Sequence, residues 1–299
     1  MSSRNRWTAV LACAALTATL GCDSGFIDTG GYLVSNEQEV ELGKGVDVEI
    51  EKEYKIVDAS EPLAQWGVQL AAKLQAASVG FRDPAEFGGY KVEVIADDEL
   101  VNAFAAPGGY TYVSTGLILS ASSCAEIAGV LGHEMGHVAH RHGVKALEKS
   151  YLATELATAL LGEGTGSDLA VLAWEFLAST KFSQIQEKQS DSTGLQIAFD
   201  AGYNPYALVD FFQVLLAQER AAGVAMPEFL SSHPETLDRI NAITAEIESR
   251  YGAAANPKTT QSYECQGTQL KLIDVQNAIK AKQYKIKAGT GTQPRQRGN

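Results

Sequence analysis

Basic residues are scarce in this chain. Its 299 residues include 24 lysines and arginines against 36 aspartates and glutamates, which gives a formal net charge of -12. A nucleic-acid binder needs a concentrated positive surface to neutralise phosphates, so this balance argues against that class. Hydrophobic residues make up 45% of the chain and charged residues 20%. This composition is typical of a globular protein with one large core or two small ones.

The sequence also lacks a hydrophobic run long enough for an ordinary membrane span. Trp7–Leu20 is apolar, but it is short and follows two arginines at the very start of the chain. That pattern predicts an export signal over residues 1–21. Lys145–Leu161 and Asp168–Phe182 are rich in apolar residues, but glutamates and aspartates interrupt them. We therefore expect core helices there and no membrane spans.

Cysteine is rare as well, with four residues in the whole chain. Cys22 follows Gly21 at the end of the predicted signal and precedes a short polar stretch. This arrangement resembles a bacterial lipoprotein cleavage site, although Thr19 stands where leucine is usual. It predicts lipidation of Cys22, a tether over residues 22–34 and attachment to a bacterial envelope membrane. The alternative is an ordinary secretory signal with an incidental cysteine.

The two remaining cysteines have one possible intramolecular pairing. We expect Cys13 to leave with the signal and Cys22 to be lipidated. The exported chain then has two thiols that can pair in an oxidising compartment, Cys124 and Cys265. A bridge between them would attach the segment after Tyr251 to the start of a helix that follows Ser123. The alternative is that Cys124 is a small buried apolar residue and Cys265 an exposed thiol.

That helix carries the most informative motif in the chain, an H-E-x-x-H sequence. An apolar run at helical spacing, with Ser123 and Glu126 as a predicted capping box, indicates a helix within Ser123–His142. His133 and His137 lie four residues apart and so share one helix face, where both imidazoles can reach one metal ion. Glu134 lies about 100° around the helix, where it can act as the base for a metal-activated water. The alternative is a chance match on a polar helix.

Two histidines need a third protein ligand. The metzincin continuation would need glycine and histidine where His140 and Gly143 stand, so His140 is interpreted as an outer or surface residue. Gluzincins instead use a glutamate on a later helix, often with an acid four residues further on that orients a metal-binding histidine. Between Gly143 and Asp191, Glu187 is the glutamate with such an acid, Asp191 itself. The alternative is a solvated helix face with ordinary charges.

The remaining pattern predicts helices around a small amount of strand. Apolar and polar residues alternate in Tyr90–Ile95 with the two-residue period of a β-strand. Asn102–Leu117 contains two short strand-like runs around a Pro-Gly-Gly turn. One of these runs should edge the cleft beside the metal helix and could pair with an extended peptide, or the two could form an ordinary hairpin. Helices are expected over four further ranges: Ser35–Tyr54, Ser60–Leu74, Pro205–Glu219 and a stretch capped by Ser232 that runs to Arg250.

Taken together, these motifs resemble the metallopeptidase family of CaaX prenyl proteases and HtpX, and most of all its soluble periplasmic branch, which includes BepA and LoiP. The resemblance covers Ser35–Tyr251. It rests on five segments: Ser35–Glu39, Asn102–Leu117, Gly132–His142, Phe182–Asp191 and Ser231–Pro234.

The resemblance implies an α+β, mainly helical, zincin-like gluzincin domain over residues 35–252, with a small β-sheet edging the cleft. It implies that His133, His137 and Glu187 hold one Zn²⁺, that Glu134 is the general base and that Asp191 orients a ligand. The chain departs from the family pattern at Gln189 and Ser190, where an acid and an alanine are usual. After Tyr251 we expect no long helical-repeat tail of the BepA kind. Residues 253–299 are a short extension that we expect to be disordered from Ala288 onward.

His233, in the Ser-His-Pro segment, is the last candidate. Its likeness to the family suggests that it reaches the cleft and either polarises the scissile carbonyl or occupies the open zinc position. The alternative is a loop histidine packed beside Pro234.

The expected function is that of an exported zinc endopeptidase that cleaves extended or misfolded envelope proteins. The expected partners are polypeptide substrates and the lipid anchor, with no nucleic acid, and no oligomeric state is indicated. A periplasmic chaperone or assembly factor that uses the same cleft without turnover is the alternative, and a small-substrate zinc hydrolase is a third possibility. The intact base Glu134 favours the protease, because a closed structural zinc site has no use for it.

Overall fold

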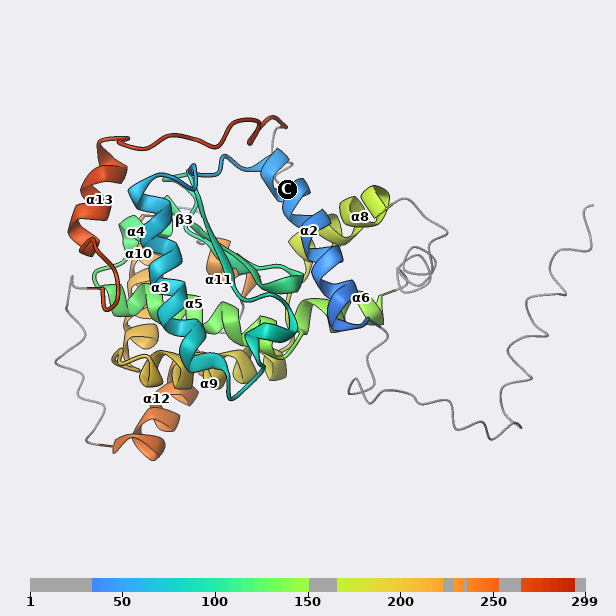
Figure 1. The fold of residues 1–299 in the computed structure, drawn as a ribbon. Coiled ribbons are helices and arrows are strands. Elements are labelled where there is room, and N and C mark those ends of the chain that lie inside the picture. Colours follow the sequence, from blue (N-terminus) through green and yellow to red (C-terminus); the bar gives the residue numbers. More distant parts are fainter. Residues whose placement is uncertain (1–33, 151–165, 223–227, 234–235, 253–264, 294–299) are drawn as a thin grey trace, which may run out of the picture. The chain divides into compact units, whose positions relative to one another are not determined.

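The fold is mainly helical, with one small sheet. A computed structural model describes residues 34–150, 166–222, 228–233, 236–252 and 265–293 (Figure 1). The predicted export signal and Cys22 lie outside these described residues. The prediction of an α+β fold dominated by helices is confirmed. None of the helices in the described ranges is long and apolar enough to cross a membrane.

The first half of the chain supplies two long helices and the sheet. A capping box opens the first helix, because the Ser35 side chain accepts from Gln38 N and the Gln38 side chain accepts from Ser35 N. The elements are α2 (Asn36–Glu53), α3 (Pro62–Ser78), η1 (Pro84–Glu86), β1 (Lys91–Ile95), β2 (Ala103–Ala105), η2 (Pro107–Gly109), β3 (Tyr110–Ser114) and α4 (Thr115–Ser120).

The sheet has the strand order β1-β3-β2. β3 pairs with β1 in parallel and with β2 in antiparallel orientation, so the two predicted strand-like runs do form an antiparallel pair. The turn between them needs glycine, because Gly108 and Gly109 have φ values of 72° and 83°. Ile56 forms a bridge with Ile95 on the outer side of β1. β2 forms the other edge of the sheet and packs against the helix that carries the H-E-x-x-H motif, α5 (Cys124–Ala139).

The described residues in the second half of the chain are mainly helical. It contains α5 (Cys124–Ala139), α6 (His142–Lys149), α8 (Gly166–Ser179), α9 (Gln184–Asp200), α10 (Ala207–Ala222), α11 (Glu228–Ser232), α12 (Thr236–Arg250) and α13 (Leu272–Lys280).

The helix predicted within Ser123–His142 is α5, which carries the motif, and Arg141 has a left-handed backbone (φ 54°) that separates α5 from α6. Two local predictions in this half need correction. Ser123 does cap α5, but the Glu126 carboxylate accepts from Ser122 N in place of Ser123 N. Ser232 is the last residue of α11, with its hydroxyl bonded to the Glu228 carbonyl, and does not cap α12.

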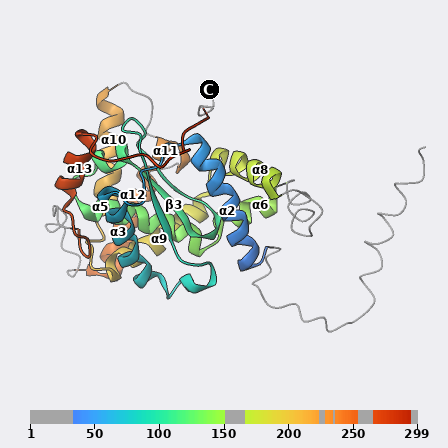
Figure 2. The same ribbon diagram turned by 45° about the horizontal axis from the view of Figure 1, so that its top comes forward.

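Two hydrophobic clusters lie on opposite faces of the sheet, as expected for strands whose side chains alternate. Val94 and Val113 belong to the larger cluster, which residues of α3, α5, α9, α10 and α13 complete. Ile95 and Tyr112 belong to the smaller one, with residues of α2 and α8. These two helices lie side by side in both views (Figures 1 and 2). Because β3 is buried on both faces, it forms the centre of the fold.

The C-terminal extension is ordered further than predicted. A disulfide joins Cys265 to Cys124 at the start of α5, with Cα atoms 5.2 Å apart. Beyond α13 the chain runs back along α2, where Gly291 N donates to the Glu51 carbonyl and Gln293 N to that of Lys52. The prediction of disorder from Ala288 is therefore wrong up to residue 293. Backbone hydrogen bonds to α2 hold this segment in place, although its composition is typical of disordered chain.

Candidate metal centre

Helices α5 and α9 approach so closely that their backbones touch. An added Cβ at Gly132 would lie 2.9 Å from the Gly194 carbonyl oxygen, and one at Gly136 would lie 2.9 Å from the Ser190 Cα. Real Cβ atoms essentially never show contacts below 3.0 Å. The glycines around the two histidines thus allow the H-E-x-x-H helix to meet the helix that carries Glu187 and Asp191.

This crossing brings the predicted ligands together. His133, His137, Glu187 and His233 each offer a donor atom, and these atoms all lie within 4.8 Å of one another. The Nε2 atoms of His133 and His137 are 3.0 Å apart, and the Glu187 oxygens lie 3.6 and 3.5 Å from them. All four residues are at most 3% exposed. Donors on a zinc ion at about 2.0–2.1 Å are roughly 3.3 Å apart in a tetrahedron, so the set fits zinc.

Glu134 lies beside this cluster with one carboxylate oxygen unsatisfied. Its Oε1 is buried, has no hydrogen-bond partner among the described residues and lies 3.5 Å from His233 Nε2. A buried acceptor without a partner is costly, which indicates that a further group belongs there. Burial raises the pKa of Glu134 above its ordinary value. A raised pKa is what a carboxylate needs to exchange protons near neutrality.

His233 follows α11 and points into the same cluster. Its Nδ1 lies 3.0 Å from Glu187 Oε1 and 3.3 Å from His133 Nε2, and the residue is 2% exposed. Burial lowers the pKa of His233, but the carboxylates of Glu187 and Glu134 outweigh it, and the net shift is upward. The structure thus places His233 beside His133 and Glu187, while Pro234, its partner in the alternative interpretation, lies outside the described residues.

A buried ion pair holds the carboxylates in place. Asp191 Oδ1 lies 2.9 Å from His133 Nδ1, and Arg239 on α12 donates to both Asp191 oxygens at 2.8 and 2.7 Å. Arg239 also lies 2.8 Å from Glu187 Oε2 and donates to the His233 carbonyl. Although burial raises the pKa of Asp191, hydrogen bonds from Arg239 and His133 lower it to about 2. Asp191 is therefore a charged partner of His133.

Sequence reasoning missed Arg239 and His142. Arg239 lies four residues before Ile243 and so shares its buried face of α12, which is a readable signal for a paired cation. His142 Nδ1 lies 3.1 Å from His137 Nδ1, and burial lowers the pKa of His142 to about 4. His140, by contrast, bonds Thr193 at 2.8 Å and lies outside the cluster, as predicted for an outer residue.

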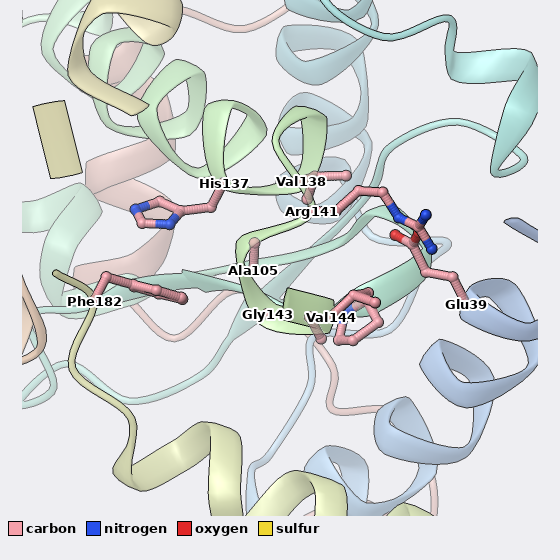
Figure 3. Close-up of a pocket in the computed structure, with 10 residues that line it drawn as sticks. Glu39, Ala105, His137, Val138, Arg141, Gly143, Val144 and Phe182 are labelled. Carbon is pink, nitrogen blue, oxygen red and sulfur yellow. The ribbon is translucent and has the colours of Figure 1, made fainter. Parts of the chain in front are cut away.

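A narrow pocket adjoins His137 (Figure 3). Figure 3 shows the His137 and Phe182 rings at one end and the Arg141 and Glu39 side chains together at the other, with Ala105 of β2 between them. Glu39, which is 1% exposed, accepts from Arg141 Nε at 2.8 Å and from Gly108 N at 3.2 Å. Glu39 of α2 thus links the residue that follows α5 to the turn that leads into β3.

A buried H-E-x-x-H pair joined by a glutamate from a second helix is the donor arrangement of gluzincin metallopeptidases. The sequence pattern described as Peptidase family M48 matches residues 63–247, and the chain belongs to this family.

Individual relatives of the chain are also named as proteases. The chain is 31% identical to mitochondrial metalloendopeptidase OMA1 of Arabidopsis thaliana over 47% of its own length and 28% of the relative's. It is 27% identical to the beta-barrel assembly-enhancing protease of Yersinia pestis, over 69% of this chain and 46% of that protein. It is 26% identical to metalloprotease LoiP of Escherichia coli, over 78% of this chain and 94% of that protein. The first two relatives extend well beyond the matched region.

Proposed function

We propose that this protein is a zinc-dependent endopeptidase in which His133, His137 and Glu187 hold the metal. The observation that carries the proposal is the unsatisfied, buried carboxylate oxygen of Glu134 next to a cluster with zinc-like donor spacing. Zinc held by these residues would supply Lewis-acid chemistry for activating a water and polarising a peptide carbonyl. Glu134 accepts the proton of the attacking water and delivers it to the leaving amine. Asp191, fixed by Arg239, orients His133.

In this proposal His233 would be a fourth protein donor to the metal in the described conformation. Its Nδ1 is as close to Glu187 and His133 as those residues are to each other, which suits a fourth donor. The short helix before it also contacts the chain just before β2, because Phe229 N donates to the Val101 carbonyl. Turnover then requires α11 to move. His233→Ala should raise turnover with zinc content unchanged, whereas a lower turnover would indicate transition-state stabilisation instead.

The proposed substrates are extended or misfolded envelope polypeptides. β2 pairs with β3 on one side only among the described strands, and it packs against α5. Backbone groups on such an edge can pair with an extended chain without requiring a particular side chain. Figure 3 shows Ala105, the last residue of β2, in the middle of the pocket that His137 and Phe182 close at one end. A bound strand would therefore run past the metal centre.

The decisive test compares wild type, Glu134→Gln and Glu175→Gln. Glu175 is an exposed glutamate on α8, so its substitution is a matched control. We expect about one zinc per chain in all three, casein cleavage by wild type and the control, and a loss of at least roughly a hundredfold in Glu134→Gln. Zinc binding without Glu134-dependent cleavage would favour the chaperone, which should then suppress aggregation of an unfolded client in both forms.

We also propose that residues 1–21 are an export signal, that Cys22 is lipidated and that residues 22–34 tether the 35–252 domain to an envelope membrane. The support is the sequence pattern alone. Cys22→Ser should move the protein from the membrane fraction to the soluble periplasmic fraction, and mass spectrometry of the mature N-terminus should find a lipid on Cys22. An unmodified N-terminus in the periplasm would indicate an ordinary secretory signal.

A further inference from the structure

The second ring nitrogen of His137 has a partner of its own. Its Nε2 faces the metal cluster, 3.0 Å from His133 Nε2, so its Nδ1 points away. That Nδ1 lies 3.1 Å from His142 Nδ1. On the other side of the His142 ring, Nε2 lies 3.1 Å from Gln189 Oε1. The three side chains thus form a hydrogen-bonded series from the buried cluster to the exposed surface of α9.

Metal binding allows one proton arrangement in this series. A histidine that binds a metal through Nε2 must carry its proton on Nδ1, so His137 donates to His142. His142 then accepts at Nδ1 and keeps its own proton on Nε2, which donates to the Gln189 carbonyl oxygen. A reversed amide would donate to His142 Nε2, and the proton would be forced onto His137 Nε2, the ligand atom. The amide orientation with oxygen toward His142 is therefore the one that favours the ligand tautomer.

The backbone brings His142 into this position by breaking the helix. Five residues on a continuous helix would turn His142 about 140° away from His137. The left-handed Arg141 instead ends α5, and its guanidinium is paired with Glu39 at 2.8 Å. His142 is 1% exposed, so its ring is held by packing as well as by hydrogen bonds.

The two metal histidines are thus supported differently. His133 contacts a carboxylate, Asp191, which is itself paired with Arg239. His137 contacts the His142 imidazole, which in turn contacts the Gln189 amide, and Ser190 Oγ lies 3.3 Å from His142 Nδ1. Gln189 and Ser190 are the two positions at which the chain departs from the family pattern, and both contact His142.

We propose that His142 and Gln189 are positioning residues that set the tautomer and rotation of His137 for zinc binding. The inference rests on the proposed function in one respect, that His137 is a zinc ligand. Outer partners of metal-bound histidines typically change metal affinity by roughly ten- to a hundredfold. His142, which contacts the ligand directly, should have the larger effect and Gln189 the smaller.

The test measures zinc affinity by competition with a chromogenic chelator, and the ligand-field spectrum of the cobalt-substituted protein. His142→Phe keeps a ring without nitrogen and should weaken zinc binding by roughly ten- to a hundredfold and alter the cobalt spectrum. Gln189→Leu removes the acceptor and should weaken binding up to roughly tenfold, while Gln189→Glu retains an acceptor and should bind at least as tightly as wild type. Lys188→Ala, an exposed neighbour on α9, is the matched control and should equal wild type.

Wild-type affinity and spectrum in His142→Phe would overturn the inference, as would equal affinities in Gln189→Leu and Gln189→Glu. If His142→Phe fails to fold, the comparison of Gln189→Leu with Gln189→Glu still tests the inference, because the Gln189 side chain is exposed. The outcomes also separate this inference from the proposed function. If the His142 and Gln189 variants bind zinc more weakly but the wild type shows no Glu134-dependent cleavage, the positioning role stands and the protease function is refuted. If these variants bind zinc like the wild type and the wild type is an active protease, the positioning role alone is refuted.

Discussion

Replacing Gly194 by alanine tests whether close contact between α5 and α9 builds the metal centre. An added Cβ would lie 2.5 Å from His133 N and 2.7 Å from His133 Cα. The shorter distance is about 0.9 Å below 3.4 Å, where ordinary contact begins. Both atoms belong to the backbone of α5, so no side-chain rotation can relieve the overlap. The helices must separate or twist.

Gly67→Ala provides the matched control. Gly67 lies within α3, and its added Cβ would meet Val94 and Val92 side-chain atoms at 3.5 and 3.6 Å, which is ordinary contact. Both substitutions gain about 1 kcal/mol of helix propensity, so this contribution cancels between them. The remaining difference is the overpacking cost at Gly194, about 1–3 kcal/mol.

Urea unfolding of both variants with chelator present measures this difference without any contribution from bound metal. Gly194→Ala should be less stable than Gly67→Ala by about 1–3 kcal/mol. Because a ligand constellation must hold its geometry within about 0.5 Å, Gly194→Ala should also bind zinc more weakly, while Gly67→Ala should match wild type. Equal stability of the two variants, together with wild-type zinc affinity in Gly194→Ala, would refute the reasoning.

Three further predictions address the rest of the fold. Replacing Cys124 and Cys265 together by alanine should lower the free energy of unfolding by about 2–5 kcal/mol, since the bridge closes a separation of 141 residues; urea curves that match the oxidised wild type would contradict this. Burial raises the pKa of Glu93 to about 7. The contribution of Glu93 to the free energy of unfolding is therefore fully present below about pH 4.5, where the carboxyl of the unfolded chain titrates, and it is lost as the pH rises toward 7. Glu93→Gln should flatten that decline in urea curves taken at pH 5 and pH 8, and an unchanged pH dependence would count against it. Arg239→Ala leaves the buried Asp191 carboxylate without its bidentate partner and should cost about 3–5 kcal/mol in the same assay; a loss below about 1 kcal/mol would show that the pair is not stabilising.

The sequence by itself determined several features whose physical cause is local. The capping boxes at Ser35 and Ser183 form as such patterns predict, because each involves backbone groups within one helical turn. Four-residue spacing places His133 with His137, and Glu187 with Asp191, on shared helix faces for the same reason. The family resemblance also depends on ordered local motifs, and it is confirmed.

Only the tertiary structure decided the features that depend on distant partners. The left-handed turn at Arg141, which the helical pattern concealed, is accompanied by an ion pair with Glu39, 102 residues away. Arg239 meets Asp191 because α12 packs on α9, and no local pattern specifies that packing. The C-terminal segment has a disordered composition, yet it is ordered by backbone bonds to α2. Contacts across such separations carry no periodic signal in the sequence, since their free energy appears only when both elements are in place.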